Sequence, residues 1–156
     1  MKNTYQKTIL SPIVAYRRQW NADGRGKLIE CLRNDDDAYT TFGQTYVTTI
    51  KPGIIKAWHY HEKQTDRMML LRGLVRFVGY DMHEKRVVLD FIVDEQDPHL
   101  IVIPKGIYHG FQNVGTKEAY IINTPDHVYN RNTPDEIRTS PYTDGIPFAW
   151  DITMDG

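Results

Sequence analysis

The sequence predicts an all-β protein, a small barrel of short antiparallel strands. From residue 42 onward, apolar and β-branched runs recur at short intervals with turn residues between them, which is the spacing typical of a β-sandwich or barrel. No long stretch carries a helical repeat of apolar side chains, so few helical residues are expected. The expected strands are residues 26–32, 44–50, 54–60, 68–71, 74–80, 86–93, 99–103 and 119–122.

Length and composition favour one domain. The chain has 156 residues, of which 40% are hydrophobic, and a chain of this size builds a single core. We expect one domain over residues 1–156, with a core barrel at about 25–124. The C-terminal segment 125–156 is rich in Pro, Asn, Asp and Thr, so it should be mostly irregular and wrap the outside. Its apolar run 148–152 should dock back onto the barrel.

Charge and cysteine content exclude several classes of protein. The formal net charge is −1, with acidic and basic residues interspersed, so we expect no nucleic-acid partner and no attraction to an anionic membrane. Cys31 is the only cysteine and forms no internal disulfide, which favours a cytoplasmic location. No apolar run approaches the length of a membrane span, and the N-terminus does not resemble a signal peptide.

Three histidines and one aspartate form a candidate metal site. His59 and His61 lie two residues apart, so in a strand they project from the same face. A polar turn precedes Asp66 and can bring it to that face, and His109 follows the turn Pro-Lys-Gly. Imidazole and carboxylate are ligands of divalent transition metals. We predict that His59, His61, Asp66 and His109 bind one such ion (Zn, Mn, Fe or Ni), with no organic cofactor.

An interpretation without metal is also open. Asp66 would then hydrogen-bond His59 and fix the tautomer of its imidazole, as an acid partner fixes a catalytic base.

The motifs around these residues carry a family resemblance. Gly53, His59, His61, Asp66 and Gly73, followed by Pro104, Gly106, His109 and Asn113, have the spacing of the two cupin motifs. In chain order, the segments RGKLIE, FGQTYVTTIKPGIIKAWHYH, LRGLVRFVGYDM, IPKGIYHGF, VYN and GIPFAWDI resemble the dTDP-4-dehydrorhamnose 3,5-epimerase family. The resemblance implies a double-stranded β-helix, the jelly-roll cupin barrel, paired into a homodimer. It also implies a nucleotide-sugar substrate. The N-terminal segment is the expected strand for addition to the partner's sheet.

The resemblance also implies roles for individual residues. His59 falls on the family's catalytic base, His109 on its active-site histidine, and Lys56 on the arginine of its Arg-Gly-Leu-His motif. The family's proton-donating tyrosine falls on Asn123, and Tyr120 or Tyr108 is the nearest candidate for that role. Apart from the resemblance, Arg67 belongs to a basic set with Arg72 and Arg76. Such a set is more often a solvated face, but Arg67 is a candidate for binding the diphosphate or stabilising an enolate. The positions matching nucleotide contacts are Arg25, Glu30, Gln44 and Tyr129.

Three departures from the family pattern bear on the chemistry. Asp66 replaces a lysine and His61 replaces a glutamine, and both changes favour a bound cation. The family's C-terminal segment, which supplies an acid partner for the base, is not expected because the sequence ends at Gly156.

Two function classes follow from these features. The first is an epimerase or isomerase acting on a dTDP-4-keto-6-deoxyhexose, in which His59 removes a proton next to the carbonyl. For this class we expect at most one stereocentre to be exchanged, or an isomerisation that uses one base. The second class is a metal cupin outside sugar-nucleotide metabolism, either an Fe(II) oxygenase or a binding module without catalysis.

Overall fold

The computed structural model describes residues 7–10 and 12–150, and its secondary structure consists of strands. The strands up to the second motif are β1 (Lys7–Leu10), β2 (Ile13–Arg17), β3 (Asn21–Asp23), β4 (Gly26–Leu28), β5 (Tyr46–Ile50), β6 (Ile55–His61), β7 (Asp66–Arg72), β8 (Leu74–Asp81), β9 (Arg86–Asp94) and β10 (His99–Ile103). The remaining strands are β11 (Tyr108–Asn113), β12 (Ala119–Asn123) and β13 (Glu136–Arg138). Across the described ranges, no helix is present that could cross a membrane.

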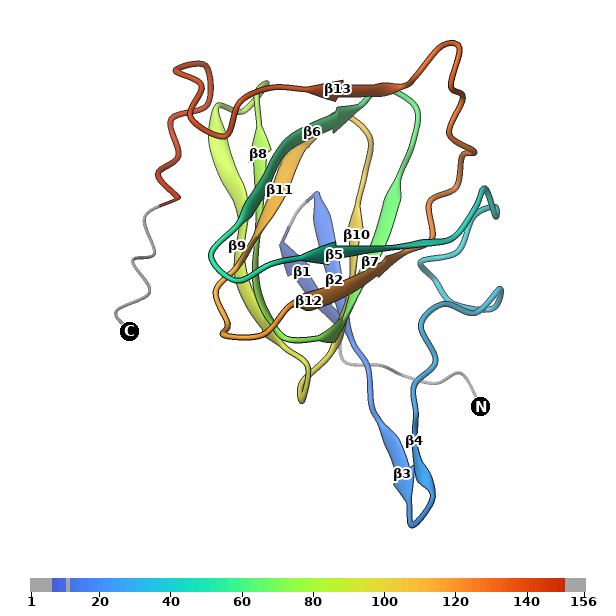
Figure 1. Ribbon diagram of the computed structural model, residues 1–156. Coiled ribbons are helices and arrows are strands. Elements are labelled where there is room, and N and C mark those ends of the chain that lie inside the picture. The colour runs from blue at the N-terminus through green and yellow to red at the C-terminus, as the bar shows by residue number, and fades with distance from the viewer. Residues whose placement is uncertain (1–6, 11, 151–156) are drawn as a thin grey trace.

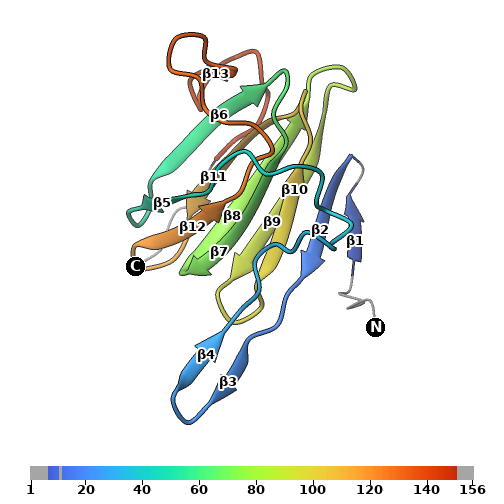
Figure 2. The ribbon, with the colours of Figure 1, turned by 90° about the vertical axis from the view of Figure 1, so that its right-hand side faces the viewer.

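The strands form two antiparallel sheets that face each other (Figure 1). One sheet has six strands in the order β1-β2-β10-β7-β12-β5, and the other has five in the order β13-β6-β11-β8-β9. Apart from the consecutive pairs β1–β2 and β8–β9, neighbours in each sheet are not consecutive in sequence, as in a jelly roll. The prediction of an all-β jelly-roll barrel is therefore confirmed. The β3–β4 hairpin extends away from this barrel (Figure 2).

The main core lies between the two sheets. Strand alternation directs Leu70, Ile101 and Ile121 inward from the six-stranded sheet, where they meet Phe77 and Phe111 from the other sheet. Each is at most 2% exposed. Fully burying one such side chain contributes roughly 1.5–3 kcal/mol to stability, so this core holds the two sheets at the separation that the site requires.

The C-terminal apolar run docks onto the barrel as far as it is described. Trp150 is 3% exposed, and its ring lies 5.0 Å from the ring of Trp58 on β6 and 5.0 Å from that of Phe148. Residues 151–152 of the expected run lie outside the described residues. This aromatic cluster anchors the end of the C-terminal segment beside β6, the strand that carries His59 and His61.

Candidate active site

A cavity of about 830 Å³ opens among β5, β6 and the segment 127–138. The C-terminal segment, which was expected to wrap the outside, forms one wall of this cavity. The reason is that β13 pairs with β6, placing Glu136 opposite His61 and Arg138 opposite His59. The lining includes Gln44, Tyr46, Thr48, Lys56, His59, His61, Lys63, Gln64, Met68, Phe111, Tyr129, Asp135, Glu136 and Arg138.

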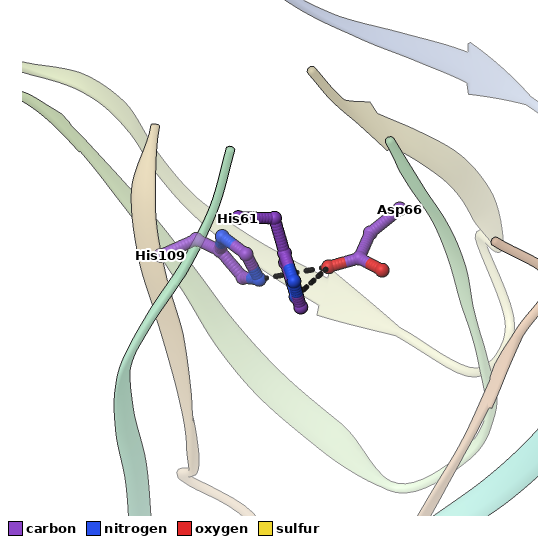
Figure 3. A group of neighbouring side chains, drawn as sticks. All are labelled: His61, Asp66 and His109. Atoms are coloured by element: carbon purple, nitrogen blue, oxygen red, sulfur yellow. Dashed lines mark ion pairs between the residues drawn. The ribbon is translucent and has the colours of Figure 1, made fainter. Parts of the chain in front are cut away.

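Three of the four predicted metal ligands lie together, buried beside this cavity (Figure 3). His61 ends β6, Asp66 begins β7, and His109 lies on β11. One ligand atom from each lies within 4.8 Å of the others. His61 Nε2 is 3.4 Å and His109 Nε2 is 3.0 Å from Asp66 Oδ2. The fourth predicted ligand, His59, lies outside this group.

The two oxygens of Asp66 have different partners. Oδ1 accepts hydrogen bonds from the Gln64 side-chain amide at 2.7 Å and from the Asn123 amide at 2.8 Å. Oδ2 faces the two imidazole nitrogens instead. Burial alone would raise the pKa of Asp66, but the adjacent His109 and His61 outweigh burial and lower that pKa. The carboxylate therefore stays ionised, with one oxygen directed at the histidines.

His109 directs its Nε2, which has no hydrogen-bond partner among the described residues, toward Asp66 Oδ2. Its Nδ1 lies 3.0 Å from the carbonyl oxygen of Ile107, and because a carbonyl only accepts, Nδ1 carries the proton. His109 Nε2 is buried, and no described residue gives it a hydrogen bond. In the neutral imidazole its lone pair would face the Asp66 carboxylate. The arrangement therefore calls for a positive charge, either a proton on Nε2 or a bound cation.

His61 lies between two carboxylates. Its Nδ1 is 3.5 Å from Asp135 Oδ2, on the side opposite Asp66. Burial lowers the pKa of His61, but Asp66, Glu136 and Asp135 outweigh burial and raise it. Asp135 also accepts the backbone N–H groups of the β6–β7 turn, at residues 62–64, at 3.0–3.2 Å. Sequence reasoning missed Asp135, because nothing in an irregular segment indicates contact with a turn about seventy residues earlier in the chain.

The three buried side chains fit a divalent ion. With ligand distances of about 2.0–2.2 Å, neighbouring donor atoms on an ion lie roughly 3.0–3.5 Å apart. The separations of 3.0 and 3.4 Å at Asp66 Oδ2 match this range. His109 Nε2, which has no hydrogen-bond partner among the described residues, is an imidazole nitrogen of the kind that ligates divalent transition metals.

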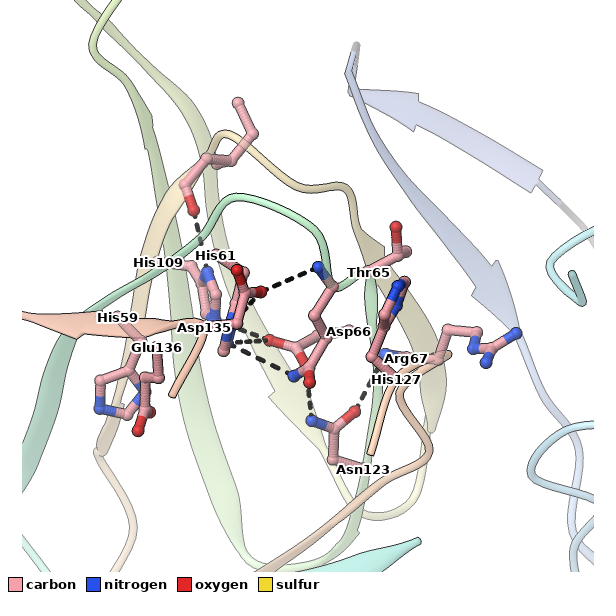
Figure 4. Close-up of polar contacts among 12 residues, drawn as sticks. His59, His61, Thr65, Asp66, Arg67, His109, Asn123, His127, Asp135 and Glu136 are labelled. Carbon is pink, nitrogen blue, oxygen red and sulfur yellow. Dashed lines mark hydrogen bonds and ion pairs between the residues drawn. The ribbon is translucent and has the colours of Figure 1, made fainter. Parts of the chain in front are cut away.

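His59 has an acid partner of its own, Glu136 (Figure 4). His59 Nδ1 is 3.7 Å from Glu136 Oε1, while Glu136 Oε2 accepts two hydrogen bonds from the Arg138 guanidinium, at 2.6 and 2.8 Å. No acid partner was expected from the family's C-terminal segment, and β13 places the Glu136 carboxylate beside His59. Asp66 was the alternative partner for His59, but its carboxylate lies against His61 and His109.

His59 is suited to act as a base. Its side chain is 22% exposed and lines the cavity. Burial and, second, the nearby His109 lower the pKa of His59 to about 4, against the opposing effect of Glu136. The imidazole is therefore neutral at physiological pH. Because Nδ1 faces Glu136, Nε2 is the nitrogen left to take a proton from a ligand.

Comparison with known proteins identifies the family. Residues 21–137 match the model of the polysaccharide biosynthesis C-terminal domain. The chain belongs to that family. The spore coat polysaccharide biosynthesis protein SpsL of Bacillus subtilis is 36% identical to this chain, over 83% of this chain and 89% of SpsL. The probable low-salt glycan biosynthesis epimerase Agl13 of Haloferax volcanii is also 36% identical, over 80% of this chain and 83% of Agl13.

Solved structures show that this chain shares its fold with proteins described as sugar-nucleotide enzymes. A dTDP sugar isomerase from Desulfovibrio desulfuricans superposes with a TM-score of 0.83 at 23% identity, covering 89% of this chain and 90% of that chain. The dTDP-4-dehydrorhamnose 3,5-epimerase from Sulfolobus tokodaii superposes with a TM-score of 0.76 at 19% identity, covering 88% and 82%. The predicted resemblance to that epimerase family is confirmed at the level of fold.

Besides His59, three of the residues predicted for substrate binding or catalysis line the cavity of this family member. Gln44 lines it from the loop just before β5, Lys56 from β6 and Tyr129 from the C-terminal segment. The Lys56 ammonium donates a hydrogen bond to Thr48 Oγ1 at 2.9 Å, which joins β6 to β5 across the cavity.

The structure places Arg67 away from the cavity. Its side chain donates hydrogen bonds to the carbonyl oxygens of Ala38, Thr41 and Thr124, and the residue is 1% exposed. Successive residues of a strand point to opposite faces, so Arg67 points away from the face to which Asp66 contributes. The prediction that Arg67 binds substrate is corrected to a structural role in holding the loop before β5.

Arg25 and Glu30 also lie apart from the cavity lining. Arg25 is on the β3–β4 hairpin, where its 89% exposed side chain pairs with Asp23 at 2.6 Å. Glu30 pairs with Arg33 at 2.8 Å. Within this one chain, neither residue lines the cavity.

Tyr120, the predicted proton donor, does not line the cavity. Its ring lies against the Arg72 guanidinium, 5.7 Å from the ring centre, while its neighbours Ala119 and Ile121 face the core. The prediction for Tyr120 is therefore corrected. A different tyrosine, Tyr46, lines the cavity, and sequence reasoning had assigned it no catalytic role.

Proposed function

We propose that the chain is a sugar-nucleotide epimerase or isomerase, with His59 as the base that removes a proton next to the carbonyl of a dTDP-4-keto-6-deoxyhexose. The observation that carries this proposal is the pair formed by His59 and Glu136 at the cavity wall. A neutral imidazole that is oriented by a carboxylate and faces a ligand cavity is the arrangement a general base needs. The relatives in glycan and polysaccharide biosynthesis support the same class of reaction.

Proton removal next to a carbonyl also needs a positive group for the developing enolate. Lys56 lines the same cavity as His59 and is three residues from it on β6. The Arg138 guanidinium is engaged by Glu136, so it serves the base rather than the substrate. Lys56 is therefore the protein's own group for polarising the carbonyl oxygen.

The proposal includes a divalent metal ion held by His61, Asp66 and His109. Its support is the ionised Asp66 oxygen directed at two imidazole nitrogens, one of which has no hydrogen-bond partner among the described residues. An ion bound there would supply Lewis-acid chemistry to a ligand oxygen. Asn123 and Gln64 orient the carboxylate for this role, and Asp135 orients His61.

The cavity suits a nucleotide-linked sugar in size and lining. Ligand sites are usually about 300–1,000 Å³, and this cavity has about 830 Å³. Gln44 and Tyr129 provide a hydrogen-bonding amide and an aromatic ring, and Lys63 adds a positive charge suited to a diphosphate. A cytoplasmic location, where nucleotide sugars are made, is part of the proposal.

A second candidate function rests on the metal site itself. Two histidines and one carboxylate form the ligand set of many Fe(II) oxygenases, and His61, Asp66 and His109 are such a set. In that case the chain would be a metal cupin outside sugar-nucleotide metabolism, either an Fe(II) oxygenase or a non-catalytic binding module. The two candidates differ in whether a nucleotide binds.

Nucleotide binding tests the proposal. We expect dTDP to raise the melting temperature of the protein in a thermal-shift titration, because a ligand that binds only the folded state stabilises it. Replacing Tyr129 by Ala should reduce this shift, whereas replacing the exposed Tyr142 by Phe should not. No shift with dTDP or UDP, together with oxygen consumption by the iron-loaded protein, would favour the second candidate.

We also propose a homodimer. Strand β1 is an edge of the six-stranded sheet, with β2 as its partner among the described residues. An unpaired edge is available for pairing with another chain, and the extended β3–β4 hairpin carries Arg25 beyond the barrel. Multi-angle light scattering at micromolar concentration should give twice the 18.2 kDa mass of the chain. A mass of one chain would contradict the dimer.

A further inference from the structure

The proposed function leaves one catalytic group to be found. Inverting a carbon centre requires a base on one face of that carbon and an acid on the other, because the proton returns from the side opposite its removal. His59 lies on β6 of the five-stranded sheet. The acid should therefore line the same cavity from the six-stranded sheet.

Tyr46 is on that opposite wall. It begins β5, at the edge of the six-stranded sheet, and its side chain lines the cavity. The Lys56 to Thr48 hydrogen bond shows how close the two walls are, because it joins β6 to β5 directly at 2.9 Å. Tyr46 therefore faces the space that a ligand held against His59 and Lys56 would occupy.

The hydrogen bonds around Asn123 determine where the Tyr46 proton points. Asn123 lies opposite Tyr46 in the β12–β5 pair. Its Oδ1 accepts the backbone N–H of Arg67 at 3.0 Å, which identifies the other atom as the amide nitrogen. That nitrogen donates to Asp66 Oδ1 and to the Tyr46 hydroxyl, both at 2.8 Å.

The Tyr46 oxygen is thus a hydrogen-bond acceptor from Asn123. A hydroxyl has one proton, so that proton must be directed away from Asn123. No described residue accepts it. An O–H group that is held by its oxygen and lines a cavity is available to a ligand.

We propose that Tyr46 is the catalytic acid that returns a proton to the carbon from which His59 removes one. His59 Nε2 takes the proton, the C–H electron pair forms the C=C bond of the enolate, and the carbonyl π pair moves to oxygen. As these electrons return, the carbon forms its new C–H bond on the opposite face with the Tyr46 hydroxyl proton. The Tyr46 phenolate then takes a proton from water, and the His59 imidazolium releases one to water.

The environment of Tyr46 supports an acid rather than a base. Burial and, second, the charge of Asp66 raise the pKa of Tyr46 to about 12. The phenol is therefore protonated at physiological pH, ready to donate. The other sequence candidates lack a place at the cavity, because Tyr120 lies against Arg72 and Tyr108 stacks on Tyr60 with ring centres 4.6 Å apart.

The test compares inversion with proton exchange in Tyr46→Phe. The variant keeps the ring but lacks the donated proton, and Asn123 retains Asp66 as an acceptor. In D₂O with dTDP-4-keto-6-deoxyglucose, we expect inversion to fall by about 10²-fold or more, while His59-dependent exchange of the substrate proton continues. When the inverted epimer is offered separately to Tyr46→Phe, its proton at that carbon should not exchange with solvent. Tyr142→Phe, at a 76% exposed tyrosine, should match the wild type in all three measurements.

Four results would overturn the proposal. Inversion by Tyr46→Phe at the wild-type rate would exclude Tyr46, and so would equal loss of exchange and inversion in a variant whose melting temperature is unchanged. No exchange by the wild type would reject the proposed function on which this inference rests. If Tyr46→Phe does not fold, a single turnover of the wild-type protein in D₂O tests the proposal instead. The new epimer should carry solvent deuterium, and return of the substrate's own proton would contradict a separate acid.

Discussion

Replacing His59 by Ala should abolish deuterium exchange into a dTDP-4-keto-6-deoxyhexose. Removing a general base usually lowers a rate by about 10²–10⁴-fold, and His59 is the cavity imidazole that faces the Glu136 carboxylate. Exchange would be followed by proton NMR, with the exposed His83→Ala as control. Exchange by His59→Ala at more than a tenth of the wild-type rate would show that another group is the base.

The pH profile provides an independent check on His59. Its pKa is lowered to about 4, so the imidazole loses its function as a base only when the pH falls through about 4. The acid limb of kcat/KM should therefore lie near pH 4 rather than near the ordinary histidine value of about 6.5. A limb at 6–7 would mean that the pKa of the base is not lowered as the surroundings of His59 require.

Replacing Asp66 by Asn should largely abolish metal binding. Asp66 is the only charged ligand of the proposed site, and its Oδ2 is the atom that both imidazole nitrogens face. Changes to residues that merely orient ligands cost about 10–100-fold in metal affinity, so the loss of this ligand should cost more than about 100-fold. Titration calorimetry with Zn²⁺ would measure the change.

The matched variants separate the metal site from general effects. His61→Ala should also lose the ion, whereas His83→Ala should retain it, because His83 is exposed and outside the group. Equal metal content of the wild type, Asp66→Asn and His61→Ala after identical loading would contradict the metal site. His109 would then carry a proton on Nε2 and form an ion pair with Asp66.

Most strands could be predicted because alternation of apolar residues is a local signal. Strand β11 was missed because its sequence, YHGFQN, is largely polar and contains Gly110, although its side chains are mostly buried. The glycine has a physical reason, since a Cβ at Gly110 would lie 2.3 Å from the Ala57 Cβ on β6. This close approach brings β11 against β6, and His109 opposite His59.

The site was predictable only in part, because only some of its residues belong to local sequence patterns. His61, Asp66 and His109 lie in local motifs, and the spacing of those motifs predicted them. Strand parity could also have excluded Arg67, because its neighbour Asp66 faces inward. Asp135 and Glu136 come from an irregular segment whose pairing with β6 is long-range. No local pattern reveals such a contact.

Tyr46 shows a further limit of sequence reasoning. The family's tyrosine position is Asn123 in this chain, and the search for a replacement among sequence neighbours led to Tyr120. The structure places the nearest phenol across the sheet, because Asn123 on β12 pairs with Tyr46 on β5. Their separation of 77 residues in sequence hides this contact.

Solvent deuterium wash-in by the wild-type protein tests the central claim most directly. The protein would be incubated in D₂O with dTDP-4-keto-6-deoxyglucose, and the sugar protons followed by NMR. With one base, His59, and one opposing acid, Tyr46, exchange should occur at a single carbon next to the carbonyl, with inversion at that carbon. No exchange at either neighbouring carbon, together with no dTDP binding, would contradict the account and place the chain among metal cupins outside sugar-nucleotide metabolism.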